Sequence, residues 1–396
     1  MRDWGKSRYT RRMDDPTRHL IQAIHDSPPR AVLTAAGAGS RALADLLAVP
    51  GASRTLLEAL IPYAADSFDE FLGLRPDQYV SADTGRRMAG RALARARHLR
   101  ELETWPLVGL ACTAAVVTDR PKKGEHRAHV AAWSPERLRA HTLRLEKGAR
   151  DRAGEEGLVS ALILNALAEA SGLTEQLPLA LGPGDALSSE TVEFAPPAEQ
   201  LHHDAIPFFG ILPDGAITTE PPAAILSGAF NPLHAGHTGL AATAAALLGR
   251  PVAFELAAVN ADKGPLPPAA VLDRLSQFAG RYPAYAANAP TFNQKARLYP
   301  GAVFVIGFDT AERVIQPRYY GDSQAGMLAA LDELRARGNR FLVAGRLDDN
   351  GLFHELPELN LPAGYETLFE AIPARLFRHD VSSTEIRAAL KAEAAE

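Results

Sequence analysis

The chain has 396 residues, 46% of them hydrophobic and 22% charged, and this balance excludes an intrinsically disordered protein. The net charge of −5 argues against a general nucleic-acid-binding protein, and the single cysteine excludes an internal disulfide and a cysteine-based metal cluster. No apolar run is long enough to span a membrane. We therefore expect two domains of a soluble cytoplasmic protein that binds small molecules, not nucleic acid or membrane, with a homo-oligomer left open.

The first half of the chain alternates between helical and extended patterns. After a basic, flexible tail at 1–15, apolar spacing predicts a helix over 16–25, and the two prolines after it end that helix. Apolar runs predict strands over 31–34, 107–117 and 130–133, and helical spacing predicts helices from Ser40 through Leu47 and over 156–170. This alternation indicates an α/β domain over 16–190.

Prolines and glycines interrupt every pattern between 173 and 222, so we interpret 191–220 as a linker. A second α/β domain follows over 221–396. Its predicted strands are 225–227, 252–257, 302–307 and 341–345, and its predicted helices are 238–248, 323–337 and a last one from about Thr384. No residues stand at the spacing of a metal site.

Two histidines stand where the first strand of this second domain passes into a helix. The stretch is Gly228-Ala229-Phe230-Asn231-Pro232-Leu233-His234-Ala235-Gly236-His237. The start of a helix attracts phosphate through its exposed N–H groups and its dipole. His234 and His237 are three residues apart and so share a helix face, where both can donate to phosphate oxygens. Two purely structural histidines are the alternative.

A serine-rich segment near the C-terminus predicts a second helix start of this kind. Within Val381–Arg387, Ser382 and the glutamate three residues later form a capping box, which alone would account for the pattern. The same start presents Ser383 and Thr384 as donors to phosphates, and Arg387 adds a forked cation for a leaving pyrophosphate.

These two segments resemble the HxGH and ISSTxxR motifs of the nucleotidyltransferase superfamily, over 223–392. The resemblance implies a Rossmann-like domain with a doubly wound parallel sheet. It also implies transfer of a nucleoside monophosphate from a nucleoside triphosphate to a phosphorylated acceptor, with release of pyrophosphate. The catalytic residues would be His234, His237 and Arg387. The nucleotide-binding residues would include Gly228, Phe230, Gly236, Ser382, Ser383 and Thr384.

The strand at 302–307 ends in a Gly-x-Asp turn that resembles the adenosine-binding turn of nicotinamide mononucleotide adenylyltransferases. Gly307 and Asp309 would then bind the nucleotide, although Asp309 also fits a helix cap. The favoured reaction is ATP plus nicotinamide mononucleotide giving NAD and pyrophosphate, with Mg²⁺ held by phosphates and water. Lys263 and Thr291 are weaker acceptor-site candidates. Cytidylyltransferases and pantetheine-phosphate adenylyltransferases carry the same motifs and are the alternatives.

Residues 30–172 resemble the C-terminal domain of the CinA family, which includes nicotinamide mononucleotide deamidases, through Leu46–Ser53 and Gly109–Ala114. The family's nucleophilic serine falls on Ala36 and its lysine on Phe68, and only Thr113 of its polar set remains. Without a nucleophile, we expect no deamidase activity. The glycine-rich loop at 35–40 could still cradle a phosphate, which leaves a non-catalytic nucleotide sensor as the alternative of another class. A simple tight turn explains the glycines equally well.

Overall fold

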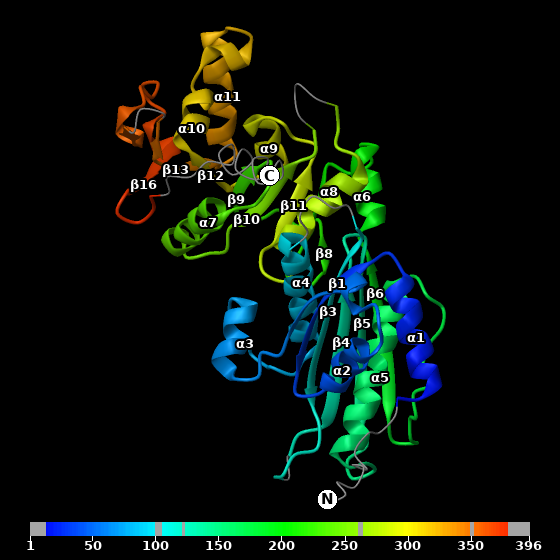
Figure 1. Ribbon diagram of the computed structural model, residues 1–396. Coiled ribbons are helices and arrows are strands. Elements are labelled where there is room, and N and C mark those ends of the chain that lie inside the picture. The colour runs from blue at the N-terminus through cyan, green and yellow to red at the C-terminus, as the bar shows by residue number, and fades with distance from the viewer. Residues whose placement is uncertain (1–12, 100–104, 121–122, 260–263, 349–351, 379–396) are drawn as a thin grey trace, which may run out of the picture. The chain divides into compact units, whose positions relative to one another are not determined.

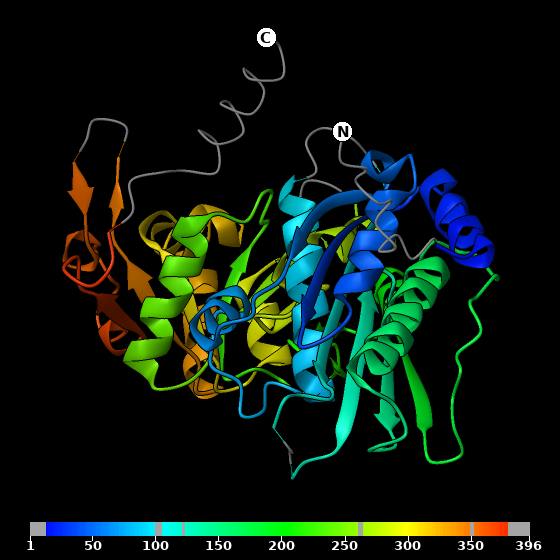
Figure 2. The ribbon, with the colours of Figure 1, turned by 60° about the horizontal axis from the view of Figure 1, so that its bottom comes forward.

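The computed structural model describes residues 13–99, 105–120, 123–259, 264–348 and 352–378. The chain divides into two units, Met1–Glu193 and Phe194–Glu396 (Figures 1 and 2). Each unit is built on its own main sheet. Within the described ranges, every helix is too short or too polar to cross a membrane.

The first unit contains a six-stranded mixed sheet in the order β2-β1-β3-β4-β5-β6. Its strands are β1 (Arg30–Ala36), β2 (Leu56–Leu60), β3 (Leu107–Ala115), β4 (His126–Trp133), β5 (Arg137–Leu145) and β6 (Ala186–Glu193). β1 pairs in parallel with β2 and β3, and the remaining pairs are antiparallel. The three strands predicted in this half are confirmed as β1, β3 and β4. The sequence pattern missed β2, β5 and β6.

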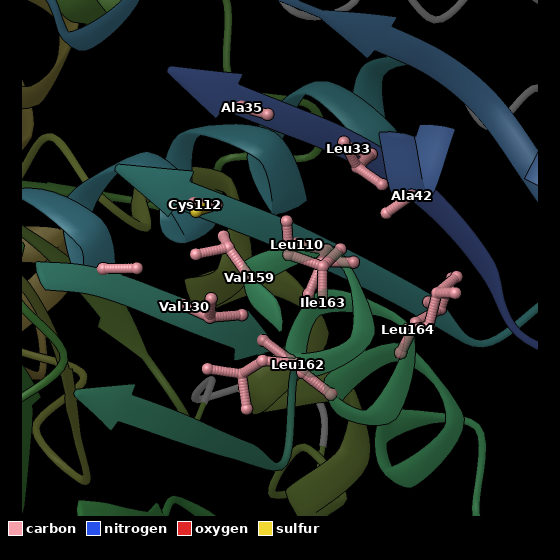
Figure 3. Packing of buried hydrophobic residues seen from close by; sticks show 14 of the residues in the cluster. Leu33, Ala35, Ala42, Leu110, Cys112, Val130, Val159, Leu162, Ile163 and Leu164 are labelled. Carbon is pink, nitrogen blue, oxygen red and sulfur yellow. The ribbon is translucent and has the colours of Figure 1, made fainter. Parts of the chain in front are cut away.

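Helices cover both faces of this sheet (Figure 2). α1 (Asp15–Asp26), α2 (Ser40–Ala48) and α5 (Arg152–Ala170) contribute to one core with alternate residues of β1, β3, β4 and β5, part of which Figure 3 shows. α4 (Ala82–Leu99) packs on the other face and α3 (Ala65–Leu72) packs against α4. α4 lies so close to β3 that a Cβ added at Gly109 would stand 2.1 Å from the carbonyl oxygen of Ala89.

The helix α1 begins inside the segment predicted to be a tail. Asp14 is its N-cap, and the Asp14 carboxylate accepts the backbone N–H of Thr17 at 2.8 Å. The predicted tail over 1–15 was therefore too long at its end, because a capping aspartate before Asp15-Pro16 starts a helix. Residues 1–12 lie outside the described part of the chain.

The main sheet of the second unit contains six parallel strands, with two further antiparallel strands added at one edge. In chain order the parallel strands are β9 (Ala224–Gly228), β10 (Ala253–Ala257), β11 (Ala284–Ala287), β12 (Val303–Gly307), β13 (Arg340–Ala344) and β16 (Phe369–Ile372). Their order across the sheet, β11-β10-β9-β12-β13-β16, is the 3-2-1-4-5-6 order of a doubly wound Rossmann-like sheet. The predicted fold class is confirmed.

Helices lie on both faces of this sheet as well. α7 (Ala235–Leu248), α8 (Pro268–Leu275) and the 3₁₀ turn η2 (Ser276–Phe278) lie on the face that carries Phe254 of β10. α9 (Phe292–Leu298), α10 (Phe308–Val314) and α11 (Gln324–Ala336) share the core of the opposite face. A small hairpin, β14 (Arg346–Leu347) and β15 (Phe353–His354), follows β13.

The segment predicted to be a linker over 191–220 is wrong for most of its length. The units meet between 193 and 194, and the following residues form α6 (Ala195–His202), β7 (Phe208–Ile211) and β8 (Ile217–Thr218). β7 extends the second sheet by pairing antiparallel with β11. The prolines that suggested a linker stand in the first turn of α6 and just outside β7, where no backbone N–H is needed.

Candidate functional site

The second sheet opens at its carboxyl edge between two neighbouring strands. β9 and β12 are paired as far as Leu226 of β9 and Val305 of β12. Beyond that point β9 pairs only with β10, up to Gly228, and β12 only with β13, up to Gly307. The strand order reverses direction between β9 and β12, and open α/β sheets bind ligands at such a point.

The histidine pair stands directly after β9, at the start of α7. His234 is the N-cap of α7, with extended backbone, and its N–H donates to Nδ1 of His237 at 3.3 Å. The His237 N–H donates in return to the His234 carbonyl oxygen at 3.0 Å. The two rings lie 3.7 Å apart between centroids, inclined by 31°. The pair therefore forms one compact unit at the first turn of the helix.

The loop before the histidines is anchored by an aromatic cluster. The Phe230 ring is 2% exposed and packs edge-to-face against His237, Phe254 and Phe278, with centroids 5.1 to 5.4 Å away. A Cβ added at Gly228 would stand 2.8 Å from this ring, so packing accounts for that glycine. A nucleotide could therefore contact the backbone of Phe230 but not its buried ring.

Gln277 holds the same loop by hydrogen bonds, and sequence reasoning missed it. Its Oε1 accepts the backbone N–H of Leu233 at 2.8 Å, and its Nε2 donates to the Phe230 carbonyl oxygen at 2.9 Å. No sequence signal pointed to Gln277, because only the fold brings η2 beside the loop.

Gly307 and Asp309 lie across the opening from the histidines, at the end of β12. Open space surrounds the position that a Gly307 Cβ would take. Gly307 is the N-cap of α10, and Asp309 lies in the first turn of that helix. Asp309 forms an ion pair with Arg346 of β14, and about two fifths of its side chain is exposed. The structure thus assigns Asp309 a charged partner in place of the predicted capping role.

The other predicted site residues are of two kinds: some have a structural explanation, and the rest lie outside the described residues. Thr291 is the N-cap of α9 and forms a capping box with Gln294, which accounts for its hydroxyl structurally. Gly236 is buried in the first turn of α7. The remaining candidates lie outside the described residues, as does the predicted last helix: Lys263, Ser382, Ser383, Thr384 and Arg387. Among the described residues, His, Cys, Asp and Glu nowhere form a group of three that could hold a metal ion.

The chain that leads to the second motif can be followed as far as Arg378. After β16 it turns and places Phe377 on α7, where the Phe377 Cε2 lies 3.2 Å from the position of a Cβ added at Gly239. Gly239 is the fifth residue of α7. The last described residues, up to Arg378, therefore approach the helix that begins with the histidine pair.

In the first unit, the retained Thr113 lies beside Ala36 and bonds to Tyr79, and Phe68, the other substituted position, packs on Tyr79. Ala36 and Thr113 are paired in register on β1 and β3. The Thr113 hydroxyl donates to the Tyr79 carbonyl oxygen at 2.7 Å, and the Phe68 ring packs edge-to-face on the Tyr79 ring at 5.2 Å. All three side chains are buried, and none is ionisable. Packing and one hydrogen bond account for this cluster.

The glycine-rich loop of the first unit already holds a negative charge of the chain itself. The Glu156 carboxylate accepts the backbone N–H groups of Gly39 and Arg41 at 3.0 Å each, and the Ser40 hydroxyl at 3.1 Å. These donors are the groups that would cradle a phosphate. The expectation that the loop could hold an external phosphate is therefore corrected, because an internal carboxylate takes that place.

No protein-family model matches the chain, and no curated protein matches it. Part of it is similar to solved structures of CinA proteins. The competence/damage inducible protein CihA from Agrobacterium tumefaciens is 20% identical, with 41% of this chain and 99% of that chain covered and a TM-score of 0.33. A CinA superfamily protein from Escherichia coli is 17% identical, with 40% and 91% covered and a TM-score of 0.30. Competence damage-inducible protein A from Klebsiella pneumoniae is 17% identical, with 39% and 95% covered and a TM-score of 0.31.

Proposed function

We propose that the second unit is a nucleotidyltransferase, which transfers a nucleoside monophosphate from a nucleoside triphosphate to a phosphorylated acceptor. ATP and nicotinamide mononucleotide, giving NAD and pyrophosphate, are the favoured substrates. One observation carries the proposal: the rings of His234 and His237 lie together at the start of α7, directly after the strand where the sheet opens. Open α/β sheets bind nucleotides at this place, and helix starts bind phosphate.

The proposed chemistry needs alignment and charge stabilisation from the protein. An oxygen of the acceptor phosphate attacks the α-phosphorus of the nucleotide. The bond from that phosphorus to the bridging oxygen of the β-phosphate breaks, and its electron pair leaves with pyrophosphate. His234 and His237 would donate to the α- and β-phosphate oxygens, where negative charge develops. The helix dipole of α7 favours the same charge.

The other side of the opening suits the nucleoside. The open space at Gly307 allows a ligand to approach the backbone closely, and Asp309 could accept from ribose hydroxyls while it pairs with Arg346. The proposed donor and nucleoside positions therefore belong to β9 and β12, the two strands that separate.

The second motif can reach the first. An extended chain spans at most about 3.6 Å per residue, so the steps from Phe377 to Ser382 allow roughly 18 Å. Phe377 contacts Gly239, which is only about 6 Å along α7 from the start of that helix. This length supports a role for Ser383 and Arg387 at the same phosphates.

Mg²⁺ would neutralise part of the triphosphate charge when it is bound. The protein groups at this site would hold the phosphates, and the phosphates and water would hold the metal ion. The histidine pair and the helix start offer N–H donors, which suit phosphate, while Mg²⁺ prefers oxygen ligands. The chain's own residues would then bind and orient the phosphates.

The first unit supports neither a deamidase nor a phosphate sensor by its loop. Ala36 offers no nucleophile, and Glu156 fills the glycine-rich loop. The similarity to CinA proteins concerns part of the chain.

The test is to incubate the full chain with ATP or CTP, Mg²⁺ and a panel of phosphorylated acceptors, and to measure pyrophosphate release. Nicotinamide mononucleotide and phosphopantetheine belong in that panel. We expect pyrophosphate and NAD from ATP and nicotinamide mononucleotide. Release only with CTP would reassign the enzyme as a cytidylyltransferase. Nucleotide binding without release from any acceptor would overturn the enzyme proposal.

A further inference from the structure

We propose that Gln277 is the positioning residue of the histidine pair, through the loop backbone that it holds. The inference rests on the proposed function of the second unit and deepens it. Gln277 lies in η2, some forty residues after the histidines, and belongs to neither sequence motif.

The amide of Gln277 is fixed by three hydrogen bonds. Its Nε2 donates to the carbonyl oxygen of Arg274, at the end of its own helix, and to that of Phe230, both at 2.9 Å. Its Oε1 accepts the N–H of Leu233 at 2.8 Å. A glutamine amide has two donor hydrogens and one acceptor oxygen, so these partners use both kinds of group and leave one orientation of the amide.

The residues that Gln277 holds bracket the segment before the histidines. Phe230 has a φ of +44°, a left-handed conformation that residues other than glycine rarely adopt. Leu233 directly precedes His234, the N-cap of α7. The segment between β9 and α7 belongs to no helix or strand, so its backbone groups need partners from elsewhere. Gln277 supplies one at each end.

The neighbour of Gln277 acts on the same loop. The Phe278 ring packs edge-to-face on the Phe230 ring at 5.2 Å and stacks on Phe254 at 4.6 Å. The turn η2 therefore holds the loop twice, by a ring and by an amide. The ring fixes the Phe230 side chain, while the amide fixes the backbone that leads to His234.

This geometry makes Gln277 act through the histidines and not on the substrate. Transition-state donors must stand at the correct distance, and a displacement of about 1 Å can lower a rate about a hundredfold. Loss of the amide should therefore lower kcat more than it raises KM, because substrate binding also uses the helix start and the far side of the opening.

The test compares three variants of the full chain. Gln277→Met keeps the side-chain length but loses all three bonds. Gln277→Glu keeps an acceptor for the Leu233 N–H and loses the donors. Gln324→Met, at an exposed glutamine that begins α11, is the matched control. Thermal unfolding of each variant shows which of them are folded.

We expect kcat for pyrophosphate release to fall by at least about tenfold in Gln277→Met, with KM for ATP changed less than about threefold. Gln277→Glu should lie between that variant and the wild type, and Gln324→Met should match the wild type. The imidazole NMR signals of His234 and His237 should shift in Gln277→Met, and the Leu233 amide should exchange with deuterium faster.

The NMR and hydrogen-exchange measurements separate the two proposals, because neither measurement requires turnover. If the wild type transfers no nucleotide, the proposed function fails, and the histidine signals still report on positioning. Unchanged histidine signals and unchanged Leu233 exchange in folded Gln277→Met would overturn the inference. Full kcat in that variant would overturn it as well.

Discussion

The carboxylate of Glu156 lies 3.0 Å from the backbone nitrogen of Gly39, at the start of α2. A bound anion would occupy the same place, because the start of a helix presents unpaired N–H groups there. The first unit thus carries its own anion, supplied by a helix that lies more than a hundred residues later in the chain.

Glu156→Ala should destabilise the first unit and open its loop. Hydrogen bonds to a charged group contribute about 1.5–3 kcal/mol, so we expect the free energy of unfolding to fall by about 2–3 kcal/mol. Inorganic phosphate should then stabilise the variant and not the wild type in denaturant titrations. Glu156→Gln, which keeps an acceptor oxygen, is the matched control and should lie between them. Equal stability of all three proteins would contradict this account of the loop.

His237→Ala should lower nucleotidyl transfer by at least about a hundredfold, the effect of removing a donor to transition-state charge. The measurement is pyrophosphate release with the best acceptor of the panel. Thr243→Ala, farther along α7, controls for changes in the helix itself. Unchanged turnover in His237→Ala would leave that histidine with a structural role only.

The contact between Gly239 and Phe377 can be measured with a double-mutant cycle. Alanine in a helix is favoured over glycine by about 0.5–1 kcal/mol, but a Cβ at Gly239 would press on the Phe377 ring. Gly239→Ala should therefore gain little or no stability in the wild type, and the full amount in a Phe377→Ala background. The same gain in both backgrounds would show that the ring does not lie there.

The buried ion pair of Glu255 and Lys295 gives a stability prediction away from the loop. Glu255 of β10 is fully buried, and Lys295 of α9 is 4% exposed. Lys295→Met leaves a buried carboxylate without its partner, which should cost about 3–5 kcal/mol of unfolding free energy. Adding Glu255→Leu should recover most of that loss, as measured by denaturant unfolding. A double variant as unstable as the single one would show that lost packing, not charge, causes the effect.

The buried His129 makes the stability of the first unit depend on pH. Burial first, and then the charges of Arg127 and Arg144, lower its pKa to about 4. In the unfolded chain a histidine titrates near 6.5, so the unfolded state takes up the proton first as the pH falls. The associated stability is complete above about pH 6.5 and is lost between about 6.5 and 4.

In His129→Gln, the unfolding free energy should therefore vary less with pH in that window, because up to about one proton fewer is taken up on unfolding. Denaturant titrations at several pH values measure this slope. His141 offers an independent repeat, because burial and Arg139 lower its pKa to about 4 as well. A slope unchanged in both variants would mean that neither histidine is held neutral by the fold.

Part of the buried frame of each unit could be predicted from the sequence. Central parallel strands such as β9 and β12 are covered on both faces and read as apolar runs. The missed elements carry weaker signals. β6 is an edge strand with mostly exposed polar residues, and the buried face of α4 consists largely of small residues set between arginines, so neither contains an apolar run.

The histidine pair could be predicted because its whole pattern lies within ten residues of sequence. Gln277, Glu156 and Arg346 could not, because each acts on a segment that only the folded sheet or helix brings beside it. The predicted linker is wrong for a related reason: the number of prolines does not show which of them stand in a first helical turn or just outside a strand.

Phe377 and Gly239, which pack together, are synthesised at different times. The ribosome makes α7 early in the second unit and reaches Phe377 only after β16, the last strand of the sheet. Domains generally fold as units. The contact between α7 and Phe377 can therefore form only after every described strand of this sheet has been made.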